Sequence, residues 1–159
     1  MGAFEALVTL VVAAPFAIGA AYYDLKTMEI PNWLSGGAAL VFAALVFATL
    51  PLDDALWRLA GGAIVLVVCF GLFAVGQMGP GDGKTAAAFA LLVAPRDAPS
   101  ALVILSMAAL ILLLVILGLR RTSLADGSWR FWRDKHLPYG VALGAALLIY
   151  LTLVLSVVS

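Results

Sequence analysis

Two aspartates, Asp24 and Asp82, are the side chains of this sequence that are best placed to do chemistry. Asp24 ends the first long uncharged stretch and opens the segment Asp-Leu-Lys-Thr-Met-Glu-Ile-Pro-Asn at residues 24–32. Asp82 lies within Gly-Pro-Gly-Asp-Gly-Lys at residues 79–84, where the glycines and the proline interrupt a helix and allow another backbone to come close. Two carboxylates that meet can share a proton and work as a general acid and a general base.

The elements that must position these two residues are apolar helices. Of the 159 residues 65% are hydrophobic and only 11% are charged, with nine acidic and nine basic side chains, and the mean hydropathy is +1.14. So few polar residues cannot cover the surface of a soluble domain, and a net charge of zero without a basic stripe excludes nucleic acid as a partner. We therefore expect an all-α, polytopic membrane protein that is surrounded by the lipid bilayer.

Charged residues divide the sequence into six uncharged runs of 11 residues or more, which predict about six transmembrane helices. Five of the runs have 18 to 23 residues, which is enough to cross about 30 Å of hydrocarbon as a helix. The fourth run has 11 residues and would span only about 16 Å, so we expect a short fourth span. The runs cover residues 6–23, 30–52, 59–81, 85–95, 98–119 and 137–159.

The basic residues predict how the spans are oriented. With six spans, alternate loops gather seven of the nine basic residues on one side and leave Arg58 and Arg96 on the other. The richer side is then cytoplasmic, and both termini lie outside. Two spans separate Asp24 from Asp82, so we expect both carboxylates at the cytoplasmic face, where they can form one site. The seven basic residues are Lys26, Lys84, Arg120, Arg121, Arg130, Arg133 and Lys135.

The rest of the sequence indicates a single domain over residues 1–159, without repeats or low-complexity tracts. Cys69 is the one cysteine, so a disulfide framework and a cysteine-based zinc site are excluded, and we expect it to pack inside a helix. No set of His and Cys ligands suggests a metal or a cofactor. Residues 120–136 mix aromatic and basic residues and form either an interfacial segment or an ordinary cytoplasmic loop, with His136 as an interfacial residue.

Three motifs together resemble the type IV prepilin peptidase family, the bacterial members of the GxGD membrane aspartyl proteases. Residues 24–32 match the pattern D-x-[KR]-x-x-x-I-P-N, and residues 79–84 match G-x-G-D-x-K. Residues 136–142, His-Leu-Pro-Tyr-Gly-Val-Ala, are similar to the P-Y-G segment that opens the last span of the family. The resemblance extends over essentially the whole chain, and the motifs keep their order and spacing.

This resemblance implies an aspartic endopeptidase of the bacterial inner membrane that removes the short basic leader from prepilins at the cytoplasmic face. It implies Asp24 and Asp82 as the catalytic pair, with neither a metal nor a cofactor. One carboxylate would activate water, and the other would protonate the scissile carbonyl group. Four further residues are candidates for binding substrate or supporting the pair: Gly79, Gly81, Lys26 and Lys84.

The resemblance also predicts the type of peptidase. Larger members of the family carry an N-terminal methyltransferase module with paired CxxC motifs, which we do not expect in a chain with one cysteine. The short form is similar to the peptidases that accompany tight-adherence, Flp-type pili. The substrate would be a prepilin-type protein, and the sequence leaves the oligomeric state open.

Two alternatives belong to other classes of protein. A small ion transporter subunit could use the Gly-Pro-Gly break and Asp82 as an ion site. Against this, both acids are expected at one face rather than at the membrane midplane, and no inverted repeat is visible. The other alternative is a non-catalytic scaffold of a pilus or secretion assembly, although both aspartates stand in full motif context.

Helix dipoles predict which carboxylate holds the shared proton. Asp24 lies at the carboxyl end of the first span, where a negative charge is disfavoured, whereas Asp82 precedes the amino end of the fourth, where it is favoured. On this basis Asp24 is the protonated partner and Asp82 is the ionised one.

Overall fold

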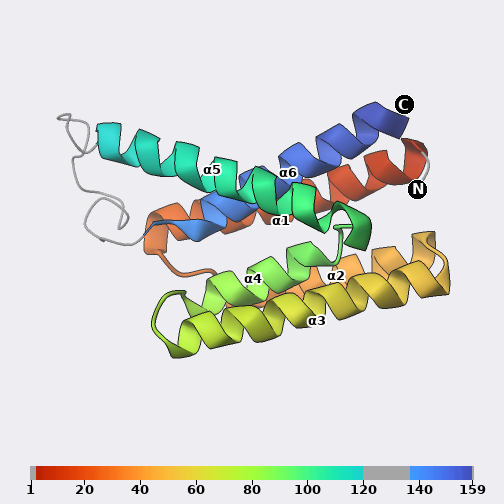
Figure 1. The fold of residues 1–159 in the computed structure, drawn as a ribbon, viewed down its shortest axis with the longest axis horizontal. Coiled ribbons are helices and arrows are strands. Elements are labelled where there is room, and N and C mark those ends of the chain that lie inside the picture. Colours follow the sequence, from red (N-terminus) through yellow and green to blue (C-terminus); the bar gives the residue numbers. More distant parts are fainter. Residues whose placement is uncertain (1–2, 120–136, 159) are drawn as a thin grey trace.

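The computed structural model describes residues 3–119 and 137–158, and in this part of the chain all regular secondary structure is helical (Figure 1). The predicted all-α class is therefore confirmed. Residues 120–136, for which the sequence leaves an interfacial segment and an ordinary loop open, lie outside the described residues, together with His136 and five of the basic residues. The helices are α1 (Ala3–Thr27), α2 (Asn32–Thr49), α3 (Leu52–Ala74), α4 (Pro80–Ala90), the short 3-10 helix η1 (Pro95–Asp97), α5 (Ala98–Leu119) and α6 (Tyr139–Val158).

Five of the described helices, all but α4 and η1, are long and apolar enough to cross a membrane. This confirms a polytopic helical membrane protein. The short fourth element is also present, but it begins at Pro80 rather than at Thr85 because Pro80 takes the first helical position after Gly79. The helix break that the glycines and the proline predict lies before Pro80, and Asp82 is in the first turn of α4 rather than ahead of its amino end. With 11 residues, α4 reaches about 16 Å and falls short of the bilayer thickness.

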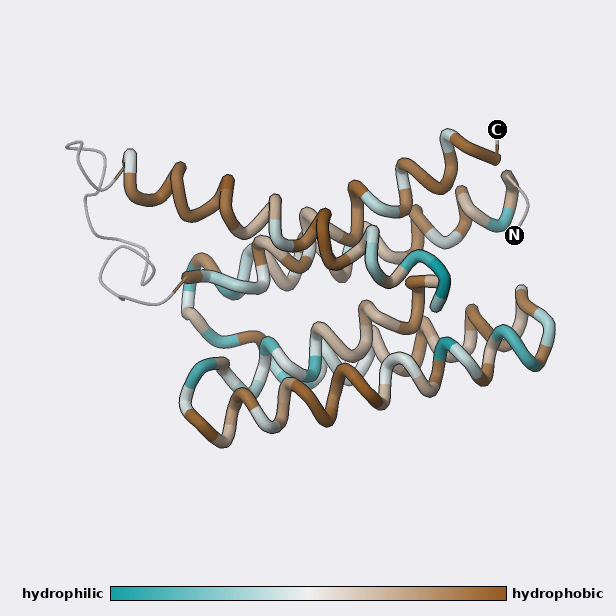
Figure 2. Tube along the Cα trace, in the orientation of Figure 1, coloured by the Kyte–Doolittle hydropathy of each residue, from teal (hydrophilic) through white to brown (hydrophobic). Residues whose placement is uncertain are grey.

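The helices form two layers (Figure 1). Helices α1, α5 and α6 make one layer, and α2, α3 and α4 make the other, with α4 also contacting α6. Successive α-helices, α4 included, run in opposite directions, so the end of α1 and the start of α4 lie at the same end of the bundle. Figure 2 shows hydrophilic residues gathered at the two ends of the bundle and hydrophobic residues along its flanks.

Small residues allow α1 and α6 to pack closely. Ala13, Ala17 and Ala20 of α1 are buried, and a Cβ atom added to Gly144 of α6 would lie 2.6 Å from the carbonyl oxygen of Ala17. Only glycine fits this approach. The spacing of Gly140 and Gly144 therefore serves helix packing, as small residues four apart do in membrane proteins, and it fixes α6 against the helix that carries Asp24.

Polar side chains from α3 and α6 compensate for the early end of α4. The chain after Ala90 leaves carbonyl and amide groups without helical partners inside an apolar bundle. Arg58 of α3 is buried and donates a hydrogen bond to the carbonyl oxygen of Leu92. The Tyr150 hydroxyl accepts a hydrogen bond from the amide of Ala94 at 3.2 Å and donates one to Asp97 at 2.9 Å. Arg58 is thus a buried residue of a helix rather than the loop residue that the charge pattern predicts.

We expect Arg58→Met to lower the free energy of unfolding by about 1–3 kcal/mol, because it leaves the buried Leu92 carbonyl group without its donor. Thermal unfolding of the purified protein in detergent measures the effect. Arg96→Met is the matched control, since the Arg96 side chain is 88% exposed. Equal unfolding temperatures for the two variants would contradict the role given to Arg58.

Candidate active site

Asp24 is buried near the carboxyl end of α1 and is held by the start of α6. Its side chain is only 3% exposed. Its Oδ2 atom accepts a hydrogen bond from the backbone amide of Gly140. Gly140 is in the first turn of α6, where amide groups have no partner within the helix. The tertiary fold thus supplies Asp24 with a donor from a helix that lies more than a hundred residues further along the chain.

Asp82 is partly buried in the first turn of α4. The backbone of Gly79, the residue that caps this helix, is hydrogen-bonded to the Asp82 carboxylate. An acid at the third helical position commonly bonds back to the capping residue in this way. A Cβ atom at Gly79 would lie 2.9 Å from Oδ2 of Asp82, so glycine at this position leaves room for the carboxylate.

Ile30 lies between the first turn of α4, which carries Asp82, and the first turn of α6, which binds Asp24. A Cβ atom at Gly81 would be 3.0 Å from the carbonyl oxygen of Ile30, and one at Gly140 would be 2.9 Å from its Cδ1 atom. The same Cβ atom at Gly140 would be 2.9 Å from Cβ of Asp24. Ile30 therefore sets the spacing between the first turns of α4 and α6, and through them the spacing between Asp24 and Asp82.

Gly140, whose amide bonds Asp24, and Gly81, which precedes Asp82, both pack against Ile30. These contacts bring into one cluster the two aspartates that the motif analysis singled out. Ile30 and Gly140 were not among the predicted site residues, although both stand inside the motifs. The motifs could have indicated both residues, because Ile30 is the isoleucine of I-P-N and Gly140 is the glycine of P-Y-G.

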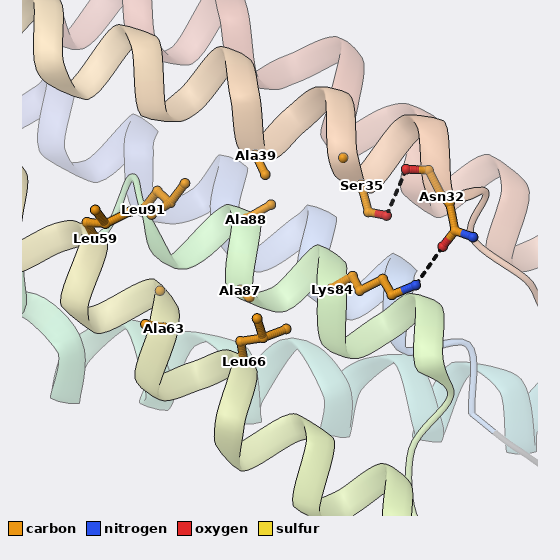
Figure 3. A pocket seen from close by; sticks show the side chains of 12 residues that line it. Asn32, Ser35, Ala39, Leu59, Ala63, Leu66, Lys84, Ala87, Ala88 and Leu91 are labelled. Carbon is orange, nitrogen blue, oxygen red and sulfur yellow. Dashed lines mark hydrogen bonds between the residues drawn. The ribbon is translucent and has the colours of Figure 1, made fainter.

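The two predicted lysines make contacts elsewhere. The Lys26 ammonium group is exposed, donates to the Tyr22 hydroxyl at 3.0 Å and lies 5.3 Å from the centre of that ring. Lys84 donates to Oδ1 of Asn32 at 2.8 Å (Figure 3). This bond ties α4 to the first residue of α2, which is also the last residue of the I-P-N motif. Roles for Lys26 and Lys84 in binding substrate or supporting the pair stay predictions.

The assignment of the shared proton stays a prediction as well. It rested on the dipoles of the helices that carry the two aspartates. The structure adds the amino end of α6, whose Gly140 amide bonds Asp24 directly. Asp24 therefore experiences the positive end of one helix dipole and the negative end of another.

Cys69 is buried in α3, as expected. A Cβ atom at Gly83 would lie 2.9 Å from Cβ of Cys69, so this cysteine forms part of the surface on which the first turn of α4 packs. Among residues 3–119 and 137–158, no three His, Cys, Asp or Glu side chains are grouped as a metal site would need.

Comparison with protein families matches residues 11–117 to the type IV leader peptidase family. The match covers about two thirds of the chain, includes both aspartates and ends before α6, so the Gly140 contact lies outside it. Comparisons with curated proteins and with solved structures gave no match. The aligned region contains α2, α3 and α4 in full and most of α1 and α5, with Asp24 and Asp82 within it, and the chain belongs to the type IV leader peptidase family.

Proposed function

We propose that this protein is an aspartic endopeptidase that cleaves the short basic leader from type IV, Flp-type prepilins. Its site would face the cytoplasm at the bacterial inner membrane. Membership of a leader peptidase family supports peptidase activity. The observation that carries the proposal is the cluster around Ile30: Gly140, whose amide bonds Asp24, and Gly81, which precedes Asp82, both pack against this residue.

In this mechanism the two carboxylates hold one proton between them, because two neighbouring carboxylates do not both ionise easily. The ionised carboxylate accepts a proton from a water molecule, whose oxygen attacks the scissile carbonyl carbon. The protonated carboxyl group donates its proton to the carbonyl oxygen. The tetrahedral intermediate then collapses and the C–N bond breaks. One carboxyl group delivers a proton to the leaving amine, and the other carboxylate takes a proton from a hydroxyl group of the intermediate, so the pair again holds one proton.

The hydrogen bonds of the site would hold both carboxylates still during these steps. The Gly140 amide fixes one oxygen of Asp24, and the backbone of Gly79 fixes Asp82. We propose that Gly79 and Gly81 keep the approach to the pair free of side chains. Lys84 would support the pair through its bond to Asn32. Lys26, exposed at the same end of the bundle, would attract an acidic residue of the substrate.

The test is co-expression with several candidate prepilins, followed by analysis of the precursor in membranes. We expect the precursor to be shortened at the junction between leader and apolar segment, and the shortening to continue in the presence of EDTA or 1,10-phenanthroline. Loss of activity with either chelator would contradict the aspartic mechanism. Precursors that all stay intact would contradict peptidase activity and favour the non-catalytic scaffold.

A further inference from the structure

Two hollows lie on either side of α4. The first, which we call the apolar groove, has a volume of about 430 Å³ and is formed by α3, α4, α5 and α6. The second, the α2 pocket, has about 440 Å³ and lies between α2, α3 and α4, with Lys84 and Asn32 among its lining residues (Figure 3). The two hollows are similar in size, so their position relative to the aspartates must distinguish them.

The apolar groove lies on the face of α4 that carries Asp82. Ala86, Phe89 and Ala90 line this groove and follow Asp82 by four, seven and eight residues, spacings that keep a residue on one side of a helix. The α2 pocket is lined by Lys84, Ala87, Ala88 and Leu91. At about 100° per residue, these positions lie on the opposite side of α4 from Asp82.

Helix α6, whose first turn binds Asp24, forms the wall of the groove that faces α4. Leu143 and Leu147 of α6 line the groove and follow Gly140 by three and seven residues, so they lie on the side of α6 near the amide that holds Asp24. The groove thus begins about one helical turn, or about 5.4 Å, beyond the aspartates. It continues along α4 and α6 as far as Pro95 and Tyr150.

The groove also opens toward the surroundings of the bundle. Ile64 and Leu102, both in its lining, are 64% and 63% exposed. A chain that enters from the bilayer must satisfy its backbone hydrogen bonds internally, so within the hydrocarbon it must be helical. A chain whose scissile bond lies at the aspartates would send its following residues directly between the two walls of the groove.

Because the groove lies on the faces of α4 and α6 that also carry the aspartate cluster, we infer that it binds the helix of the substrate that directly follows the cleaved bond. The inference rests on the proposed function. The occupant is an apolar helical segment, because a helix satisfies its own backbone hydrogen bonds within the hydrocarbon. The basic leader then extends from the other side of the aspartates, toward the end of the bundle at which α1 ends.

Photo-crosslinking at two positions of α3 tests this inference. Ile64 lines the apolar groove and Leu66 lines the α2 pocket; both are exposed aliphatic residues, two positions apart on one helix. A photoreactive phenylalanine derivative replaces either residue in the Asp82→Asn enzyme, which retains its substrate, co-expressed with a precursor that the parent enzyme shortens. We expect an adduct at 64, within the first apolar residues after the cleavage site, and none at 66.

The outcomes separate the two proposals. If the parent enzyme shortens no precursor, the proposed function fails and the groove loses its occupant. If the parent is active but the adduct forms at 66, equally at both positions, or with lipid alone at 64, the groove inference is overturned. Processing rates provide a second measurement: Ala90→Phe in the groove should slow processing by about tenfold, and Ala87→Phe in the α2 pocket by less than about twofold.

Discussion

Asp24→Asn and Asp82→Asn are each expected to abolish prepilin processing, with a loss of about 10³-fold or more. Asparagine keeps the size of the side chain and an oxygen that accepts a hydrogen bond, so the Gly140 contact of residue 24 survives the substitution. The amide can neither take a proton from water nor return one to the leaving amine. Because both steps need the pair, either substitution alone should be enough.

The measurement is the shortening of a co-expressed precursor at equal levels of enzyme in the membrane. Asp97→Asn is a suitable control, because Asp97 is also hydrogen-bonded through its carboxylate, to Tyr150, and lies in η1, beyond the carboxyl end of α4, whereas Asp82 lies in the first turn of α4. This control should process as the parent does. If both dyad variants process as well as the parent, the assignment of the aspartates is wrong even where the peptidase activity is real.

Gly140→Ala is expected to reduce processing by about 10²-fold, since misplacing a catalytic group by about 1 Å has an effect of that size. The new Cβ atom would lie 2.9 Å from Cβ of Asp24 and 2.9 Å from Cδ1 of Ile30, so one of these side chains must move. Movement of Asp24 displaces the carboxylate, and movement of Ile30 changes its spacing from α4. The backbone amide of residue 140 is retained, so the effect measured is one of position.

Gly71→Ala is the matched control for this substitution. Gly71 is also helical, and no atom lies within 4 Å of its added Cβ atom. Alanine is the better helix former by about 0.8–1.0 kcal/mol, so the control should keep both activity and thermal stability. A Gly140→Ala enzyme that cleaves as fast as the parent would show that Asp24 tolerates displacement. If Gly140→Ala has lost most of its folded protein, the assay would have to be repeated on the fraction that is folded.

Much of the architecture follows from one-dimensional properties of the chain. The length and spacing of the uncharged runs predict apolar helices, because a segment in hydrocarbon must satisfy its own backbone. Alternation of direction along consecutive helices then places Asp24 and Asp82 at one end of the bundle, as Figure 1 shows for α1 and α4. The motifs that contain the aspartates could also be recognised from the sequence, because the residues of each motif are contiguous.

The arrangement within that end of the bundle depends on how the helices pack. Helices that are apolar on all sides carry little pattern from which their rotation could be predicted. Three features of the structure depend on contacts between residues far apart in the chain. They are the hydrogen bond from Gly140 to Asp24, the packing of Gly81 and Gly140 against Ile30, and the hydrogen bond from the buried Arg58 to Leu92. The same holds for the face of α4 that Asp82 shares with the apolar groove. Close packing of small residues, such as Gly144 against Ala17, fixes these rotations, and only the folded chain brings such residues together.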